Sequence, residues 1–336
     1  RTTRTIHVRD LAIGGSAPIA VQSMAATQTR NLEATARQLQ LIQAAGADLI
    51  RVAVDSKEDV AALAKLREGT TARLSVDLPE NYRLAELVAP HVDKVRYNPG
   101  HLHHHEKHKS VEQKVAYLVE TAVKHTCALR IGINAGSIAP EYDARFPDDH
   151  VSAIVACAID HCALVDRLGF RDYLVSIKDS DPRLVVEANT RFAAERPDVP
   201  IHLGVTEAGM PPEGIIKTRI AFEQLLSRGI GDTLRVSLTL PFDDKGKEIA
   251  VGRELIKDIE EFFQIEAQRK NIAFSIHVDP ELHDSLMIDD VRLRQILINL
   301  LGNACKYTIA GSVEMTVASV QRSNDKKYLY FRVTDS

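Results

Sequence analysis

Charged side chains recur at the ends of short apolar runs along this sequence. Five of these runs carry a cation, at Arg51, Arg96, Arg130, Lys178 and Arg235. Only two carboxylates, Asp77 and Glu207, occupy comparable positions. If the run ends converge, the cations repel one another unless an anion neutralises them. Because guanidinium forks match phosphate oxygens, the set predicts a pocket for a small di-anionic or poly-anionic molecule.

Neutral polar residues accompany these charges and complete the candidate binding set. They are Asn98, Asn134, Ser137, His202, Thr206 and Ser237. Any single arginine of this kind is most simply explained as a surface salt bridge. The recurrence at equivalent points of successive runs favours a functional site instead.

The runs that carry these residues read as β-strands separated by amphipathic helices. We predict strands at 19–22, 48–54, 73–77, 94–98, 129–134, 173–178, 201–206 and 233–238. Helical patterns lie between them, at 31–45, 111–125, 151–168, 181–195 and 212–227. Eight alternations predict an α/β fold of the (β/α)8 TIM type, with the polar residues at the carboxyl ends of its strands. A doubly wound open sheet is the alternative, but no GxGxxG opens a helix.

Two further segments, one near the amino terminus and one rich in histidine, have distinctive compositions. Residues 5–18 resemble a short hairpin that caps the bottom of the barrel, with its turn at Gly14 and Gly15. Residues 101–108 hold five histidines around Glu106 and follow Asn98-Pro99-Gly100. A metal site is conceivable there, but we expect a solvated polar loop and no bound metal.

Composition narrows the function classes. The 336 residues carry a formal net charge of -4, no Trp and 5% aromatic residues, which argues against nucleic-acid binding. No apolar run could span a bilayer and no signal peptide is visible, so we expect a cytoplasmic protein. The four cysteines, Cys127, Cys157, Cys162 and Cys305, form no CxxC pair and predict buried, reduced thiols.

The pattern changes near Ile259. A charged helix at 260–270 is followed by a strand at 272–278, a long helix at about 290–307 and a hairpin of 312–320 with 328–335. This α+β order differs from the alternation before it. We therefore predict a barrel domain at 1–259 and a small second domain at 260–336.

The barrel region resembles the 4-hydroxy-3-methylbut-2-enyl diphosphate synthase family, the reductive enzymes of the methylerythritol phosphate route to isoprenoids. The matching stretches are residues 17–24 (APIAVQSM), 46–52 (GADLIRV), 96–100 (RYNPG), 130–137 (RIGINAGS), 175–178 (VSIK), 202–209 (HLGVTEAG) and 229–237 (GIGDTLRVS). The resemblance covers residues 1 to about 259.

This resemblance implies reductive ring opening of 2-C-methyl-D-erythritol 2,4-cyclodiphosphate. It places eight residues around the phosphates and hydroxyls: Arg51, Arg96, Asn98, Arg130, Asn134, Lys178, Arg235 and Ser237. It gives Glu207 the role of acid or base near the reacting carbon. It further implies a [4Fe–4S] cluster, flavodoxin or ferredoxin as electron donor, and a homodimer.

The sequence departs from this family in two ways. Asp77-Leu-Pro-Glu-Asn81 lacks the His that many members have two positions after the Asp. The family's second domain, which supplies three cysteines and a glutamate to the cluster, has no counterpart after Arg235. We therefore expect the cluster ligands to be absent from this chain, and the chain alone to be inactive.

The tail resembles the ATP-binding domain of sensor histidine kinases instead. Residues 292–308 (RLRQILINLLGNACKYT) carry the resemblance, with Asn299 and Asn303 one helical turn apart. It implies nucleotide-binding roles for Asn299, Asn303, Lys306 and Asp335. The motif of Asp335 lacks its glycines, and no ATP lid is seen, so we expect no tight binding of Mg-ATP.

Three interpretations follow from the two resemblances. The chain is the substrate barrel of the diphosphate synthase, a signalling protein with a kinase-type ATP module, or a non-functional chimera of the two pieces. The region 260–270 has no His for a phosphorelay. We therefore favour the enzyme interpretation for the barrel.

Overall fold

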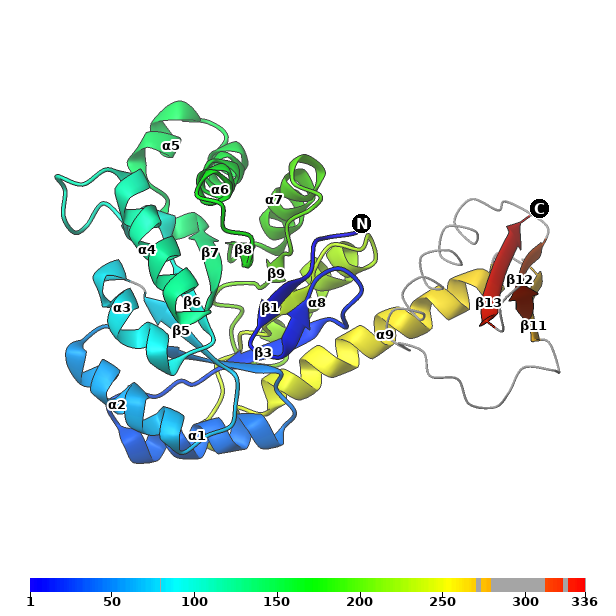
Figure 1. Cartoon of the computed structure of the whole chain (residues 1–336), viewed down its shortest axis with the longest axis horizontal. Helices are drawn as coiled ribbons and strands as arrows, with labels where there is room; N and C mark the ends of the chain where they lie inside the picture. The colour runs from blue at the N-terminus through cyan, green and yellow to red at the C-terminus, as the bar shows by residue number, and fades with distance from the viewer. Residues whose placement is uncertain (79, 270–272, 279–311, 323–325, 336) are drawn as a thin grey trace. The chain divides into compact units, whose positions relative to one another are not determined.

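The chain forms two compact units, Arg1–Ile256 and Lys257–Ser336. A computed structural model describes residues 1–78, 80–269, 273–278, 312–322 and 326–335 (Figure 1). The first unit contains the strands β3 to β10 and the helices that follow them. The second contains three strands, β11 to β13.

Eight strands form the parallel sheet of the first unit. Six of them pair in chain order: β3 (Ala20–Met24), β4 (Leu49–Ala53), β5 (Leu74–Leu78), β6 (Lys94–Tyr97), β7 (Ala128–Asn134) and β8 (Tyr173–Lys178). The last two, β9 (His202–Leu203) and β10 (Thr233–Leu234), pair with each other, and β10 pairs with β3. A parallel bridge between Val175 and Ile201 joins β8 to the start of β9. The sheet therefore closes into the predicted barrel.

An α-helix follows nearly every strand, as the barrel pattern requires. The long ones are α1 (Leu32–Ala44), α2 (Lys57–Glu68), α4 (Val111–His125), α6 (His150–Arg167), α7 (Pro182–Glu195), α8 (Glu213–Leu226) and α9 (Lys247–Arg269), with the short α3 (Ala85–Val88) and α5 (Pro140–Arg145). Side chains of Asn31, Ser56, Ser110 and Asp181 accept hydrogen bonds from the first turns of their helices. These caps satisfy backbone donors that the helix leaves open, so local sequence sets where these four helices begin.

An amino-terminal hairpin fills one end of the barrel. Strands β1 (Ile6–Val8) and β2 (Leu11–Ile13) pair antiparallel, and Ile6, Val8 and Ile13 are fully buried. They pack against the first inward residues of four strands, Ala20, Leu49, Ala128 and Leu174. The predicted cap is confirmed, but its turn was wrong. The chain reverses at Arg9-Asp10, where Arg9 has a φ of 58°, and Gly14 and Gly15 follow the second strand.

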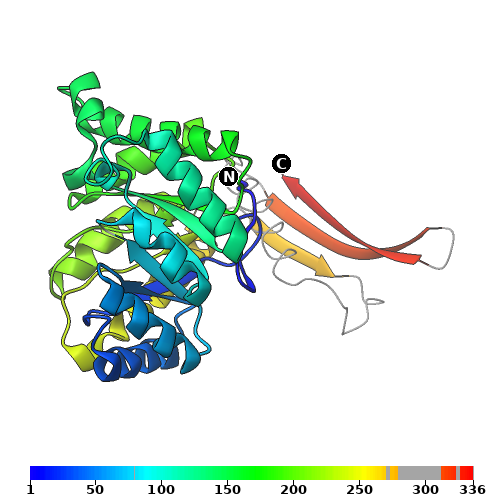
Figure 2. The ribbon, with the colours of Figure 1, turned by 60° about the vertical axis from the view of Figure 1, so that its left-hand side comes forward.

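The second unit holds a mixed three-stranded sheet (Figure 2). Strand β11 (Ala273–Val278) runs parallel to β12 (Ser312–Arg322), which pairs antiparallel with β13 (Lys326–Asp335). The hairpin is confirmed. The separate helix expected at 260–270 was wrong, because α9 runs without a break from Lys247 to Arg269. The early part of α9 is the eighth helix of the barrel, with Ile249 and Leu255 fully buried. The helix expected at about 290–307 lies outside the described residues.

In the part of the chain that the structure describes, no helix combines the length and the apolarity needed to span a bilayer.

The hairpin generates a stability prediction. Ile13→Ala should lower the free energy of unfolding of the barrel by about 2–5 kcal/mol, because it leaves a cavity among fully buried apolar side chains. Ile216→Ala is the matched control, since this isoleucine lies on α8 and is 54% exposed. Urea unfolding followed by circular dichroism measures both. Equal stability of the two variants would contradict the packing of the hairpin into the barrel.

Candidate functional site

Alternation along the strands turns the predicted polar residues toward the barrel interior. On β6, Lys94 and Arg96 alternate with Val95 and Tyr97, and all four are buried. The parallel register places Asp77 beside Arg96 and Arg96 beside Arg130. Three charged side chains from successive strands therefore stand at one level, on the same face of the sheet.

Asp77 bridges two of the arginines. Its carboxylate lies 2.8 Å from Nη1 of Arg96 and 3.2 Å from Nη1 of Arg51. All three side chains are at most 10% exposed. Burial alone would raise the pKa of Asp77, but Arg96, Arg51 and Arg130 lower it by more than burial raises it, so the carboxyl stays ionised. Arg96 also donates to the carbonyl of Gly132 at 2.8 Å.

Arg130, Lys178 and Arg235 form no ion pair with a carboxylate in the part of the chain that the structure describes. Arg130 is 1% exposed, and its Nε and Nη1 make no hydrogen bond within the described residues. Burial lowers the pKa of Arg130 and of Lys178, and the surrounding guanidinium groups lower both further. Burial likewise lowers the pKa of Arg51, to about 10, even with Asp77 beside it. Arg235 is half-buried with its Nε unpartnered.

This arrangement is electrostatically incomplete. A buried donor without an acceptor costs about 1–3 kcal/mol, and more when it is charged. Asp77 neutralises part of the charge and the buried Glu248 raises the pKa of Arg51, but the neighbouring cations still lower the pKa of Arg130 and Lys178. A bound phosphate or diphosphate would accept their hydrogen bonds and remove the repulsion. This is the electrostatic arrangement that an anion-binding site requires, and anion binding here stays a prediction.

A deeper polar layer was missed by the sequence reasoning. Lys94 is fully buried and donates to Oε1 of Gln22 at 3.0 Å across the barrel. Burial lowers the pKa of Lys94, and so do Arg130 and Arg51. Both residues alternate inward on predicted strands. A charged residue within an apolar run was the signal that could have revealed Lys94.

His202 belongs to the same interior. Its Nδ1 lies 3.4 Å from the hydroxyl of Thr233, its register partner on β10, and its Nε2 has no partner among the described residues. Burial lowers its pKa, and the neighbouring Lys178 and Arg130 lower it further, so the imidazole is neutral. A neutral imidazole can offer either a donor or an acceptor to a ligand.

Two glycines make room for the cations, and sequence reasoning missed them too. A Cβ at Gly132 would lie 2.1 Å from Nε of Arg96, and a Cβ at Gly204 would lie 2.4 Å from Nζ of Lys178. Any side chain at these positions would displace the charged group. The requirement for glycine is therefore set by the neighbouring strand and not by backbone conformation.

The loops after β6 and β7 are fastened to each other. Asn98 donates from Nδ2 to the hydroxyl of Ser137 at 2.8 Å, and its Oδ1 accepts from the amide of Gly100. A Cβ at Gly100 would lie 1.8 Å from the carbonyl oxygen of Ser137. The predicted residues Asn98 and Ser137 are thus brought together, and Asn98 positions the loop as well as offering polar atoms.

The remaining predicted residues stand at the edge of this set. Asn134, Thr206 and Ser237 are half-buried at or beyond the carboxyl ends of β7, β9 and β10. Glu207 is exposed and has a φ of 50°, a conformation that residues other than glycine rarely adopt. Among the described residues it forms no ion pair with the arginines of the pocket. Its role in catalysis therefore stays a prediction.

The described cysteines do not fit an iron–sulfur cluster. Cys127, Cys157 and Cys162 are buried. Burial raises the pKa of Cys127 and of Cys162 to about 12, and that of Cys157 still higher, so all three are thiols and not thiolate ligands. The thiol of Cys127 donates to the carbonyls of Val92 and Ala89. Cys305 lies outside the described residues.

The nucleotide-binding residues predicted in the tail are largely outside the described part of the chain. This holds for Asn299, Asn303 and Lys306. Asp335 ends β13, where its backbone pairs with Val313. The kinase-like interpretation of this region therefore stays a hypothesis.

Comparison with known sequences points to one family for the barrel. Residues 3–253 match the model of the GcpE TIM-barrel domain. A protein of Rhodopirellula baltica called 4-hydroxy-3-methylbut-2-en-1-yl diphosphate synthase (flavodoxin) is 55% identical over 258 residues, which are 76% of this chain and 68% of that protein. A Nitratiruptor protein with the same name is 42% identical over 256 residues, 76% of this chain and 69% of its own length. The family match does not extend to the second unit.

Solved structures support the fold alone. Dihydropteroate synthase from Stenotrophomonas maltophilia matches 75% of this chain and 98% of its own, with a TM-score of 0.52 and 10% identity. The enzyme of Xanthomonas albilineans, in complex with indole-2-carboxylic acid and 6-chloroguanine, matches 76% of this chain and 98% of its own, with the same TM-score and identity.

The glycine beside Lys178 generates a binding prediction. Gly204→Ala should weaken binding of inorganic pyrophosphate about tenfold or more, because the new methyl group pushes the ammonium out of its place. Gly136→Ala is the control, since a Cβ there would meet no atom within 4 Å. Calorimetric titration gives both affinities. If the two variants bind pyrophosphate equally, Lys178 does not take part in the pocket.

The lowered pKa of Lys178 predicts a pH-dependent stability difference. The pKa of Lys178 is lower in the folded state than in the unfolded state, so the folded state binds this proton less well. The free energy of unfolding therefore rises with pH up to about 10.4, where the lysine of the unfolded chain also loses its charge. Without ligand, Lys178→Met should therefore be more stable than the parent chain at neutral pH. The gain should shrink toward pH 10 by at most about 1.4 kcal/mol per pH unit.

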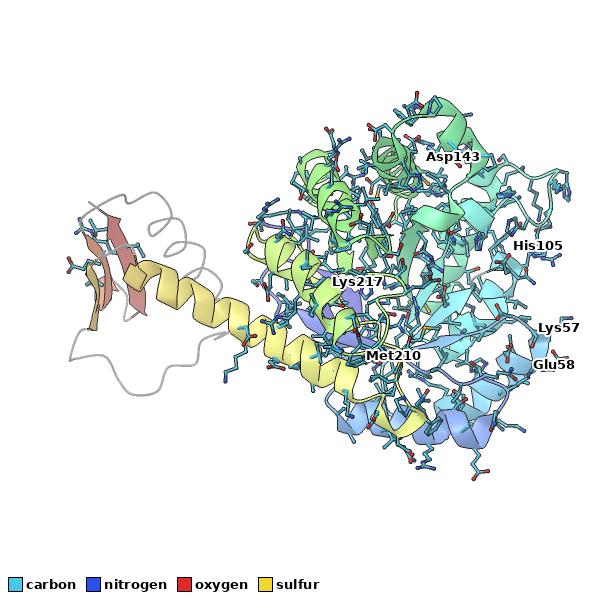
Figure 3. All side chains as sticks on the ribbon, turned by 180° about the vertical axis from the view of Figure 1, so that it is seen from behind. Lys57, Glu58, His105, Asp143, Met210 and Lys217 are labelled. Atoms are coloured by element: carbon cyan, nitrogen blue, oxygen red, sulfur yellow. The ribbon has the colours of Figure 1, made fainter. Side chains whose placement is uncertain are left out.

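Urea unfolding in phosphate-free buffer at several pH values measures this difference. Lys57→Met is the control, since Lys57 is exposed at the start of α2 (Figure 3). A stability difference that is the same at every pH would show that Lys178 is fully solvated.

Proposed function

The chain belongs to the GcpE family, whose relatives are named 4-hydroxy-3-methylbut-2-en-1-yl diphosphate synthases, and we propose that its barrel binds 2-C-methyl-D-erythritol 2,4-cyclodiphosphate. The reaction supported by this membership is the reductive opening of the cyclic diphosphate. The observation that carries the proposal is the buried guanidinium of Arg130, with two nitrogens unpartnered amid further cations.

We propose different roles in substrate binding for different interior residues. Arg130, Lys178 and Arg235 form no ion pair among the described residues, so they are the proposed ligands of the two phosphate groups. Arg51 and Arg96 are oriented by Asp77 and add two more cations to the interior. Asn98 and Ser137, already joined at 2.8 Å, close one side and offer polar atoms for hydroxyl groups.

Glu207 is the proposed acid or base. It lies in the loop between β9 and α8, three residues before Met210, which is 63% exposed and labelled in Figure 3. Holding a glutamate at positive φ costs about 1–3 kcal/mol, and such strain is found most often at functional sites. We expect this exposed carboxylate to exchange protons with a bound substrate.

The reductive reaction also needs an electron donor. The relatives' name specifies flavodoxin, and we propose the same donor class for the reaction in which this barrel takes part. The described cysteines do not fit a [4Fe–4S] cluster, so they do not supply the redox centre of this reaction. A cytoplasmic location and a homodimer are also proposed from family membership.

For residues 260–336 we keep the resemblance to a histidine-kinase ATP-binding domain as a hypothesis, without a nucleotide function. The described sheet is compatible with it, since β12 and β13 form the expected hairpin. Calorimetric titration with Mg-ATP tests the region. We expect no binding at micromolar concentration, and micromolar affinity would support the signalling interpretation instead.

Replacing Arg130 should separate ligand binding from folding. Arg130→Met should weaken binding of the cyclic diphosphate by roughly 2–5 kcal/mol, because it leaves phosphate charge unpaired in a desolvated pocket. Without ligand the variant should be at least as stable as the parent chain, since a repelling charge is gone. Titration calorimetry and thermal unfolding measure the two effects.

Two further variants complete this experiment. Arg171→Met is the cation control. The Arg171 side chain is 65% exposed and forms an ion pair with Asp166, and both residues precede β8 in the chain. Glu207→Gln should retain or tighten binding, since it keeps the shape and removes a negative charge. If Arg130→Met and Arg171→Met bind the cyclic diphosphate equally well, the proposed pocket is wrong.

A further inference from the structure

The pairing of β5 with β6 brings two loop segments together at the rim of the barrel. Leu78 at the end of β5 is the register partner of Tyr97 at the end of β6. Glu80 follows the first strand by two residues, and His101 follows the second by four. Segments that are distant in sequence therefore leave the sheet side by side.

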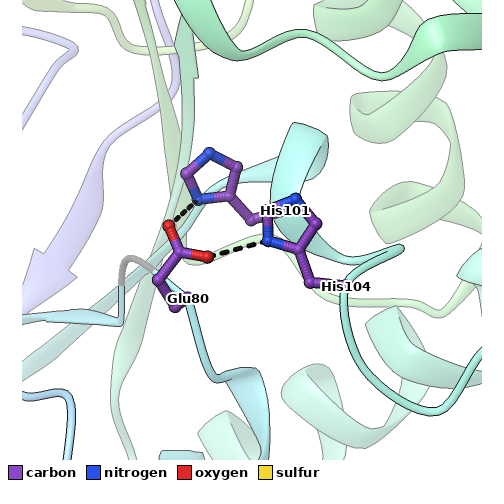
Figure 4. A group of neighbouring side chains, drawn as sticks. All are labelled: Glu80, His101 and His104. Carbon is purple, nitrogen blue, oxygen red and sulfur yellow. Dashed lines mark hydrogen bonds and ion pairs between the residues drawn. The ribbon is translucent and has the colours of Figure 1, made fainter.

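Glu80, His101 and His104 meet at this place (Figure 4). One carboxylate oxygen of Glu80 lies 3.1 Å from Nδ1 of His101, and the other lies 2.7 Å from Nδ1 of His104. The two imidazole rings stack with their centroids 4.9 Å apart. The ligand atoms of the three side chains lie within 4.8 Å of one another. Within the described residues this is the group of His, Cys, Asp and Glu side chains compact enough to hold a metal ion.

Residues on neighbouring elements hold the loop that carries the histidines in place. Lys114 on α4 donates from Nζ to the carbonyls of Leu102 and His105, both at 2.7 Å. Leu102 is 2% exposed. Glu106 accepts from the hydroxyl of Tyr82 and pairs with Lys109 at 2.8 Å. A loop fixed at several points presents its side chains with little loss of entropy on binding, as a ligand site requires.

The ligand types select the kind of ion. Two imidazoles and one carboxylate suit Zn²⁺ and its neighbours among the transition metals, whereas Ca²⁺ and Mg²⁺ prefer a shell of oxygens. Three protein ligands leave a tetrahedral ion with one open position. Asp77 cannot compete for the ion, because its carboxylate is engaged with Arg51 and Arg96.

We propose that Glu80, His101 and His104 bind one divalent transition-metal ion of the Zn²⁺ class at the rim of the barrel, a site separate from the interior cations. The ion replaces the contacts between Glu80 and the two imidazoles. Each histidine binds as the neutral ring through a nitrogen lone pair, and a ring proton on that nitrogen moves to the other ring nitrogen or to water. The step involves no change of oxidation state.

Titration of the full chain, stripped with a chelator, with Co²⁺ and with Zn²⁺ tests this proposal. We expect one ion bound per chain, with the visible absorption of a tetrahedral cobalt site and no intense sulfur-to-cobalt band. Glu80→Gln and His104→Ala should each weaken Zn²⁺ binding in calorimetry by about tenfold or more. Zinc should also raise the Tm of the parent chain and not that of the variants.

His108→Ala is the matched control, because this histidine is exposed in the same loop and lies outside the cluster. Thermal unfolding without metal establishes that all variants fold. The proposal is overturned if the parent chain binds neither ion, if cobalt shows sulfur ligation, or if His108→Ala loses as much affinity as His104→Ala. Binding of the cyclic diphosphate is measured separately, so failure of one proposal leaves the other standing.

Discussion

Repulsion among buried cations is the constraint on which the upper part of the barrel depends. Asp77 neutralises charge at Arg51 and Arg96, while Arg130 and Lys178 are left in an interior that also lowers the pKa of Lys94. Without ligand this arrangement works against folding. It is explained if the barrel was selected to hold an anion, whose binding energy compensates for the repulsion.

Apolar packing elsewhere in the barrel offsets the unfavourable free energy of these buried charges. The hairpin of β1 and β2 fills the opposite end with Ile6, Val8 and Ile13, so the lower interior is apolar. Between the two ends lies the bond from Lys94 to Gln22. The barrel interior therefore changes from apolar packing at one end to unneutralised charge at the other. The charge repulsion is confined to the end that carries the candidate site.

The rim of the pocket is built by pairs of neighbouring loops. Asn98 and Ser137 join the loops after β6 and β7, and Glu80 meets His101 and His104 across the loops after β5 and β6. Each contact follows from parallel pairing, which brings the carboxyl ends of adjacent strands to one edge. Polar groups can therefore be varied at the rim without changing the sheet beneath.

The sequence alone determined the barrel and which strand residues carry its interior charges, because alternation and strand–helix order are local patterns. It could not reveal that Asp77 bridges Arg51 and Arg96, since that depends on register between strands. Nor could it show that Gly132 and Gly204 leave room for Arg96 and Lys178, or that α9 continues past residue 260. Tertiary structure decided these points, because side-chain contacts between strands are set by packing across the sheet and not by the residues on either side in the chain.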